Sequence, residues 1–168
     1  MEDFHFGTVE MGFSGVKGLK RDKGALILGN SKIIFKGSAR FGSGSVIRAD
    51  NGVITFGKNF SCSNGCFYSC SQALSFGDNV LVGWNVNIRD ADGHTLYHDC
   101  KKVSSIKPVC IGNHVWIAAN VDILKGVSIP DGCVVAYRSC LTKPIDIEKC
   151  LVAGYPAKII RNNIEWRI

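Results

Sequence analysis

The stretch between positions 111 and 141 reads IGNHVWIAANVDILKGVSIPDGCVVAYRSCL, and every sixth residue in it is a branched aliphatic one. The six residues are Ile111, Ile117, Ile123, Ile129, Val135 and Leu141. A small or apolar residue stands two places before each of the last five: Val115, Val121, Val127, Cys133 and Ser139. Since alternate residues of a strand face the same side, each step predicts a short β-strand with two inward-facing side chains. An α-helix is disfavoured, because a period of six does not fit 3.6 residues per turn.

Earlier segments carry the same period in shorter runs, separated by small insertions. The runs are Phe35, Phe41, Ile47 and Val53, then Phe56, Cys62, Tyr68 and Leu74, then Phe76, Val82 and Ile88. Glycine and asparagine between the strands, as at Gly112-Asn113, accept the positive φ that a sharp corner requires. Three steps would close one triangular coil, so each residue would stack near the one 18 positions later: Ile111 near Ile129 and Ile117 near Val135. We therefore predict an all-β stack of coils in preference to an ordinary β-sandwich.

One long interruption divides the repeat. The step from Ile88 to Ile111 is 23 positions instead of six, so about 17 residues, roughly 90–108, are expected to leave the coil. Loops of this length are usually kept for function. The repeat domain is predicted to span 28–143, with this insertion inside it.

The two ends of the chain lack the repeat. Residues 144–168 predict a last strand followed by a short helix beginning near Pro156, and these elements would cap the open coil. Residues 1–27 are interpreted as an N-terminal arm or cap. This arm is basic because of Lys17, Lys20, Arg21 and Lys23.

Composition limits the class of protein. The chain has 168 residues, of which 46% are hydrophobic and 20% charged, and this mixture indicates one main globular domain. No apolar run approaches the roughly 18 residues of a membrane span. The N-terminus, MEDFH, lacks the basic-then-apolar order of a secretory signal, so we expect an intracellular, cytoplasmic protein. The net charge of +6 suits a phosphorylated ligand as well as a nucleic acid, but no nucleic-acid-binding motif is present and no such partner is expected.

The eight cysteines match no common metal or disulfide pattern. Cys62, Cys66 and Cys70 repeat at four-residue intervals, which is not a usual zinc spacing. The others are scattered: Cys100, Cys110, Cys133, Cys140 and Cys150. In an intracellular protein they are expected to be reduced thiols, and no bound metal is expected.

Two motifs in and after the insertion resemble a known family. The insertion contains Asp92-Gly93-His94-Thr95, and residues 107–117 read KPVCIGNHVWI. Together with the hexads, over roughly residues 28–161, these motifs resemble the hexapeptide-repeat acetyltransferases, in particular the sugar O-acetyltransferases of the galactoside, maltose and nodulation type and those of surface-polysaccharide synthesis. The resemblance implies a left-handed parallel β-helix, with the hand coming from the family alone. It also implies acetyl-CoA as the acyl donor.

His94 is the candidate general base, because an imidazole can accept a proton at neutral pH and return it afterwards. In the family the loop histidine is the base, and it aligns with His94 and not with His98 or His114. These two are interpreted as structural or acceptor-pocket residues. A carboxylate within reach would orient the His94 ring, and Asp90 and Asp92 are both candidates.

Aromatic residues predict a ligand groove. Trp116 is the middle residue of its strand and turns outward, where an exposed indole needs cover by a ligand or a neighbouring subunit. Trp84 and Asn85 fall at a corner one coil earlier and are the candidates to line the acceptor pocket, with packing at the corner as the alternative for Trp84. The resemblance extends the cofactor contacts to a longer set: Trp116, Ala118, Ala119, Tyr137, Thr142, Lys143, Lys158 and Arg161. The cations among them would face the nucleotide phosphates, whereas Tyr137 stands where the family usually has a small residue.

The function expected is direct acetyl transfer to a hydroxyl of a sugar or surface glycan. A backbone amide near Ala118 or Ala119 would stabilise the oxyanion. The resemblance also implies a homotrimer with a site between subunits. Alternatives are N-acylation of an amino sugar, a carbonic-anhydrase-like zinc enzyme and a non-catalytic scaffold. The sequence does not identify the acceptor.

Overall fold

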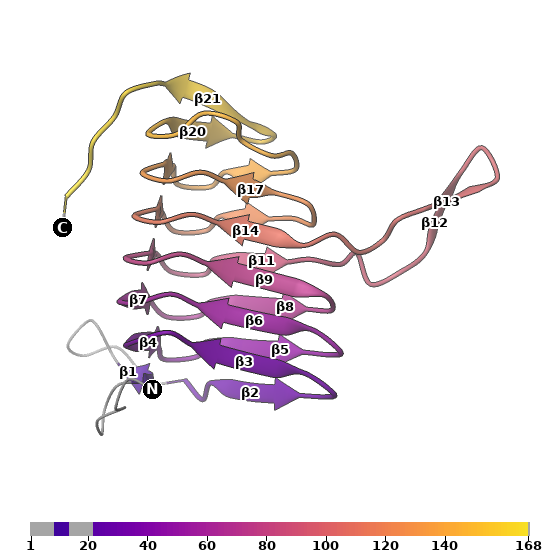
Figure 1. Cartoon of the computed structure of the whole chain (residues 1–168), viewed down its shortest axis with the longest axis horizontal. Helices are drawn as coiled ribbons and strands as arrows, with labels where there is room; N and C mark the ends of the chain where they lie inside the picture. The colour runs from indigo at the N-terminus through magenta and orange to yellow at the C-terminus, as the bar shows by residue number, and fades with distance from the viewer. Residues whose placement is uncertain (1–8, 14–21, 168) are drawn as a thin grey trace.

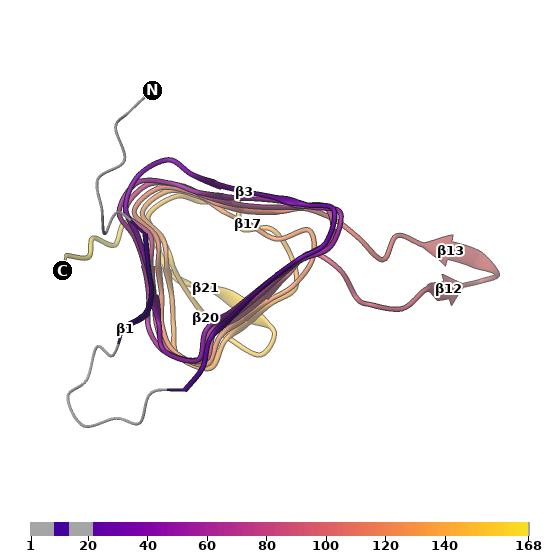
Figure 2. The same ribbon diagram turned by 90° about the horizontal axis from the view of Figure 1, so that it is seen from below.

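The chain winds into a stack of coils, and each coil is triangular when seen along the stack (Figure 1 and Figure 2). The computed structural model describes residues 9–13 and 22–167. Lys17, Lys20 and Arg21 of the predicted arm lie outside the described residues. The described ranges contain no α-helix, and therefore none long and apolar enough to cross a membrane. The predicted all-β coil is confirmed.

Three sheets form the sides of the triangle, and the chain passes through them in the order III, I, II in each coil. Sheet I consists of β1 (Val9–Phe13), β4 (Ala39–Gly42), β7 (Phe60–Cys62), β10 (Leu81–Val82), β15 (Trp116–Ile117), β18 (Val134–Val135), β20 (Leu151–Gly154) and β21 (Ala157–Arg161). Sheet II consists of β2 (Ala25–Leu28), β5 (Val46–Ala49), β8 (Phe67–Cys70), β11 (Asn87–Arg89), β16 (Asp122–Ile123) and β19 (Cys140–Leu141). Sheet III consists of β3 (Lys32–Phe35), β6 (Val53–Phe56), β9 (Ala73–Phe76), β14 (Val109–Ile111) and β17 (Ser128–Ile129).

Successive coils stack in register. The predicted pairs are both present: Ile111 with Ile129 and Ile117 with Val135. The coils approach so closely at their corners that some corners have no room for a side chain. A Cβ atom on Gly57 would lie 2.2 Å from the carbonyl oxygen of Gly77 in the next coil, so this corner requires glycine.

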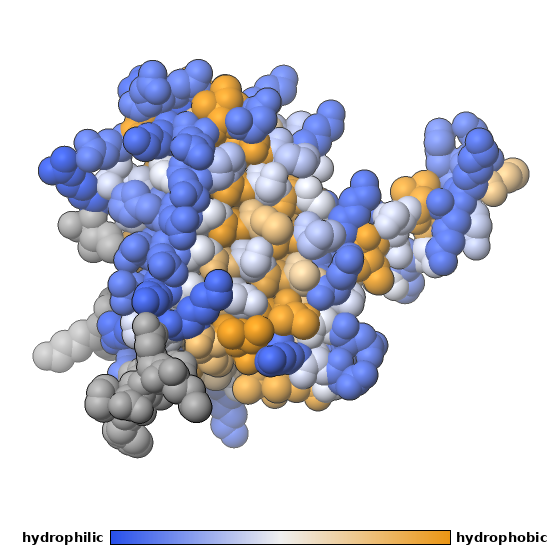
Figure 3. Space-filling view, in the orientation of Figure 1, coloured by the Kyte–Doolittle hydropathy of each residue, from blue (hydrophilic) through white to orange (hydrophobic). Residues whose placement is uncertain are grey.

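The interior is a column of apolar side chains that changes character along the stack. Its N-terminal half is built from aromatic rings: Phe35, Phe41, Phe56, Phe60, Tyr68 and Phe76. The ring centroid of Phe56 lies 4.6 Å from that of Phe60 and 5.0 Å from that of Phe76. The C-terminal half is filled by the aliphatic hexads. Apolar residues also gather on the surface at the lower end of the stack (Figure 3), where Leu26 and Leu28 of β2 are about half exposed because no further described coil lies beneath them.

The cysteines are part of this interior. Six of the eight are buried in the coil, Cys100 and Cys110 are exposed, and all eight are free thiols. Burial, followed by the charge of the neighbouring Asp90, raises the pKa of Cys70 to about 12, so this thiol stays protonated at neutral pH. Within the described residues no group of three or more histidine, cysteine, aspartate or glutamate side chains is placed to hold a metal ion.

The insertion leaves the stack at the corner between sheets II and III and is a paired structure. Its outer part is an antiparallel hairpin of β12 (Leu96–His98) and β13 (Lys101–Val103), which projects from one corner of the triangle (Figure 2). Two backbone hydrogen bonds close its base: Asp92 N donates to Ser105 O at 2.9 Å, and Lys107 N donates to Asp90 O at 2.9 Å. These bonds let β14 resume the coil beside β9.

The described parts of the predicted arm extend the sheets. β1 pairs in parallel with β4, and β2 pairs in parallel with β5 along its whole length. Residues 9–13 and 22–27 therefore contribute strands to the first coil.

The C-terminal cap is a hairpin, and the prediction of a short helix beginning near Pro156 is wrong. β20 continues sheet I, and β21 returns antiparallel to it. Ala157 and Ile159 pack against the core while Lys158 and Ile160 are exposed, which is the alternation of a strand. The open edge of β20 offers a row of backbone partners that a helix could not use.

Candidate functional site

A cavity of about 530 Å³ lies at the edge where sheet I turns into sheet II. It brings together six of the residues that the sequence predicted for the site: Trp84, Asn85, Trp116, Ala118, Ala119 and Tyr137. They come from three successive coils, so the cavity runs along the stack. The structure therefore places both predicted acceptor residues and four of the eight predicted cofactor residues in one groove.

The register of the coils explains why this edge is hollow. Val82, Ile117 and Val135 pair in series, so the residues two places after them, Trp84, Ala119 and Tyr137, occupy the same corner position of three consecutive coils. Trp84 and Tyr137 are about half exposed, whereas Ala119 between them is buried. The two aromatic corners are two strand spacings apart, roughly 9.6 Å. Alanine in the middle coil thus leaves a gap with an aromatic side chain at each end.

Trp116 forms a second wall of the groove. It faces outward on β15, as predicted, and is 39% exposed, so part of its side chain remains open to a ligand or a neighbouring chain. Its centroid lies 6.0 Å from that of Trp166 in the C-terminal tail. The tail therefore covers part of Trp116 within the same chain.

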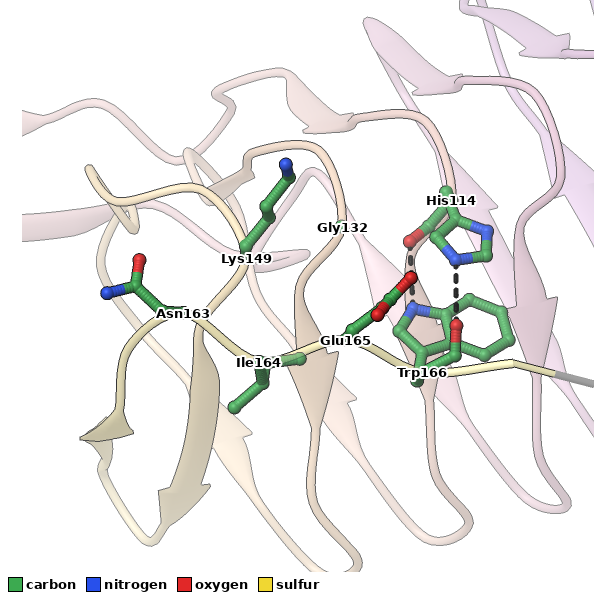
Figure 4. Close-up of a pocket in the computed structure, with 7 residues that line it drawn as sticks. All are labelled: His114, Gly132, Lys149, Asn163, Ile164, Glu165 and Trp166. Carbon is green, nitrogen blue, oxygen red and sulfur yellow. Dashed lines mark hydrogen bonds between the residues drawn. The ribbon is translucent and has the colours of Figure 1, made fainter.

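His114 and Trp166 fasten the tail to the edge between sheets III and I (Figure 4). The two rings are stacked with centroids 4.1 Å apart and an interplanar angle of 5°. Trp166 Nε1 donates to the carbonyl oxygen of His114 at 3.0 Å, and a ring nitrogen of His114 lies 3.1 Å from the carbonyl oxygen of Trp166. Of the two interpretations offered for His114, this contact supports the structural one. A cavity of about 520 Å³ lies beside this contact, between the tail and the coil.

The insertion presents His94 to solvent. His94 is exposed near the base of the hairpin, and no hydrogen bond links it to another described residue. His98 lies on β12 and is also exposed, with a ring nitrogen 3.4 Å from a carboxylate oxygen of Asp99. The imidazole of His94 is therefore open to solvent.

The two carboxylates predicted to orient His94 are both engaged elsewhere in the described chain. Asp90 is fully buried, and its carboxylate accepts hydrogen bonds from the backbone amides of Ser71, Gln72 and Ala73 at 2.7, 2.7 and 2.8 Å. It thereby holds the corner of the preceding coil. Asp92 forms an ion pair with Lys125, which ties the base of the insertion to the next coil.

The remaining predicted contacts lie on two separate edges. Thr142 and Lys143 come directly after β19, at the corner between sheets II and III. Leu124 marks the same corner in the preceding coil, and its backbone N donates to Leu141 O at 3.1 Å. They are exposed on the same edge as the insertion. Lys158 and Arg161 are exposed on β21, at the C-terminal end of sheet I.

Within one chain the groove and the predicted base lie on different edges of the stack. The groove with Trp84 and Trp116 occupies the edge between sheets I and II, and His94 projects from the edge between sheets II and III. Figure 2 shows the hairpin of the insertion projecting from one corner of the triangle, between sheets II and III, whereas the groove residues lie at the corner between sheets I and II. No residue of the described insertion lines the groove.

Sequence reasoning missed some residues of the site. Gly83 and Asn120 also line the groove, and Trp166 supports Trp116. Asn85 and Asn120 hold the same corner position in adjacent coils with φ of 52° and 56°, so the hexad register could have identified Asn120. No repeat relates Trp166 to Trp116.

No model of a known protein family matches the chain, but individual proteins do. Galactoside O-acetyltransferase of Escherichia coli K12 is 34% identical over 110 residues, which cover 64% of this chain and 53% of that protein. The putative lipopolysaccharide biosynthesis O-acetyltransferase WbbJ of the same strain is 32% identical over 142 residues, which cover 74% of this chain and 72% of that protein. The chain thus spans about half the length of the galactoside enzyme and most of WbbJ.

Solved structures agree with these relatives. The polysialic acid O-acetyltransferase OatWY superposes with a TM-score of 0.69 at 26% identity, covering 96% of this chain and 88% of that one. A galactoside acetyltransferase in complex with coenzyme A superposes with a TM-score of 0.58 at 27% identity, covering 79% of this chain and 64% of that one. Sequence and fold together show that the chain belongs to the hexapeptide-repeat sugar O-acetyltransferases and shares their left-handed parallel β-helix.

Proposed function

We propose that this protein transfers the acetyl group of acetyl-CoA to a hydroxyl of a sugar or glycan. The observation that carries the proposal is the single groove formed by Trp84, Asn85, Trp116, Ala119 and Tyr137, beside a coil that also exposes a loop histidine. The galactoside acetyltransferase solved with coenzyme A supports the choice of donor. The relatives act on oxygen, which favours O-acetylation over N-acetylation.

The reaction needs one group that accepts the proton of the hydroxyl and one hydrogen-bond donor that stabilises the oxyanion. His94 takes the proton of the acceptor hydroxyl as its oxygen attacks the thioester carbonyl, and collapse of the tetrahedral intermediate breaks the carbon–sulfur bond. The departing thiolate then recovers the proton from the imidazolium. Ala118 N already donates to Val135 O at 2.8 Å, so the amide of Ala119 is the better candidate for the oxyanion.

The complete site lies between subunits of a homotrimer. Within one chain His94 and the groove occupy different edges, and a head-to-tail ring of identical chains brings the His94 edge of each chain against the groove edge of the next. Such a contact would also cover the exposed faces of Trp84 and Trp116. Three equivalent sites result from three chains. The cytoplasmic location expected from the N-terminal residues stays a prediction.

Mixing two inactive variants tests this arrangement. His94→Ala removes the base from one edge, and Ala119→Trp fills the hollow of the other, at a corner where Trp84 and Tyr137 show that an aromatic side chain fits. Each variant alone is expected to be nearly inactive. Every trimer that carries both variants would have both edges intact at one of its three sites, so co-expressed and doubly tag-purified protein should recover about a third of wild-type activity. Activity no higher than that of either variant alone would place the site within one chain.

Donor binding depends on the exposed cations at the C-terminal end of sheet I. The Lys158→Ala/Arg161→Ala variant is expected to bind coenzyme A roughly tenfold more weakly by calorimetry, and the difference should shrink with added salt. Lys32→Ala/Lys36→Ala is the matched control, because these lysines are exposed on and after β3 at the opposite end of the stack. If the two double variants bind coenzyme A with equal affinity, the assignment of Lys158 and Arg161 to donor binding is wrong.

A further inference from the structure

A second, smaller hollow lies on sheet II at the base of the insertion. It has a volume of about 180 Å³ and is lined by residues on and just after strands of sheet II and by the base of the insertion: Arg48, Asp50, Ser69, Ser71, Arg89, Ala91, Asp92 and Gly93. The residue after Gly93 is His94. Any group bound in this hollow is therefore next to the proposed base of the same chain.

The hollow has the same origin as the groove on the other edge. Arg48 pairs with Ser69 and Ser69 with Arg89, so the three side chains stand in one outward row on β5, β8 and β11. The two guanidinium-bearing strands are two spacings apart, roughly 9.6 Å. Because the serine side chain is short and the two arginine side chains are long, space remains above Ser69 for a small ligand. The Ser69 hydroxyl would lie beneath this ligand, and a guanidinium would lie on each side of it.

Of the charged side chains that line the hollow, Arg89 is the one without an ion-pair partner among the described residues. Arg48 is paired with Asp50 at 2.7 Å, and Asp92 is paired with Lys125. Among the described residues Arg89 has no carboxylate partner; its Nη2 donates only to the amide oxygen of Asn87 at 3.1 Å. Its Nε is buried and has no hydrogen-bond partner within the described chain. A guanidinium without an acidic partner favours an anion, and the hollow is the open space beside it.

We propose that this hollow binds the carboxylate of an acidic sugar, so that the acceptor is a glycan carrying sialic-acid-type or uronic-acid-type residues. That the bound sugar is the acetyl acceptor rests on the proposed function. That the hollow binds a carboxylate is argued from the residues that line it. A planar carboxylate matches the fork of the Arg89 guanidinium and can share Arg48 with Asp50. Anchoring the acid there would hold the hydroxyls of the same sugar beside His94.

Direct binding tests the site without relying on turnover. The probes are the methyl glycosides of N-acetylneuraminic acid and of glucuronic acid, each compared with its neutral methyl ester, titrated into the full chain by calorimetry or saturation-transfer NMR. At least one acid is expected to bind the wild type more tightly than its ester. Arg89→Gln should weaken that acid by about tenfold to a hundredfold and leave the ester unchanged. Arg40→Gln is the matched control, because Arg40 also points outward from a strand but is paired with Glu10 on sheet I.

The outcomes separate this proposal from the proposed function. If neither acid is preferred to its ester, or if Arg89→Gln weakens acid and ester equally, the carboxylate site is overturned. If Arg89→Gln instead weakens coenzyme A, the hollow serves the donor phosphates and the proposal is again wrong. If the acid binds through Arg89 but no acetyl transfer is found with acetyl-CoA, the site stands and the proposed function fails.

Discussion

The His94→Ala variant is expected to fold like the wild type and to lose acetyl transfer by about 10²–10⁴-fold in kcat. The effect falls on the chemical step, because the imidazole is the proposed group that removes the proton of the acceptor hydroxyl. Stability should be nearly unchanged, since His94 is exposed and bonds to no other described side chain. Coenzyme A affinity should also be retained, because the residues proposed to bind the donor are those of the groove with Lys158 and Arg161, and the imidazole acts on the acceptor. The measurement is thiol release under saturating donor, together with a calorimetric titration.

His98→Ala provides the control on the same insertion. It removes a second exposed imidazole, which lies beside Asp99, and it should retain wild-type kcat. Wild-type turnover by folded His94→Ala would show that another group, or water, takes the proton. Equal losses in both histidine variants would point to a distorted hairpin and not to a missing base.

The second large effect concerns stability. Asp90→Ala is expected to lower the free energy of unfolding by about 3–5 kcal/mol, because it leaves three backbone amides of the preceding coil buried without their acceptor. For a chain of this size such a loss corresponds to a fall of roughly 10 °C in Tm. Thermal and urea unfolding followed by circular dichroism would measure it.

Asp90→Asn separates the structural role from a catalytic one. Its amide oxygen can still accept a hydrogen bond but carries no charge, so stability should fall by less than in Asp90→Ala. Its kcat at a temperature where it is folded should be close to wild type if Asp90 serves the coil. A large loss of kcat with unchanged stability would instead return Asp90 to the role of orienting His94.

The coil itself could be predicted from sequence because its determinants are periodic. The pairing of Ile111 with Ile129 depends only on which residues face inward and on three sides per turn, and both follow from the six-residue step. The groove was partly predictable for the same reason, since Trp84, Ala119 and Tyr137 share one corner position. A large, small, large series at one corner position indicates a hollow at the middle coil.

Predictions from local sequence were wrong where the pattern was short, and where the contacts of a residue lay in another coil. Pro156 favoured a helix start, but the alternation of Ala157 and Ile159 and the open edge of β20 favoured a strand. Asp90 was one of two candidates to orient His94, four residues later in the sequence, yet its carboxylate accepts hydrogen bonds from backbone amides that begin at Ser71, one coil earlier.

By itself, then, the sequence determined the stacked all-β coil and the position of the insertion, because both follow from the six-residue repeat and its interruption. It also determined the family resemblance, because the motifs that carry it are contiguous in the sequence. Only the tertiary structure decided that His94 and the groove lie on different edges, that Trp166 supports Trp116, and that Arg48 and Arg89 flank one hollow. The physical reason is that these relations depend on which corner of the triangle each segment reaches. A repeat specifies how coils stack, whereas the tail and the insertion pack through contacts that no period encodes.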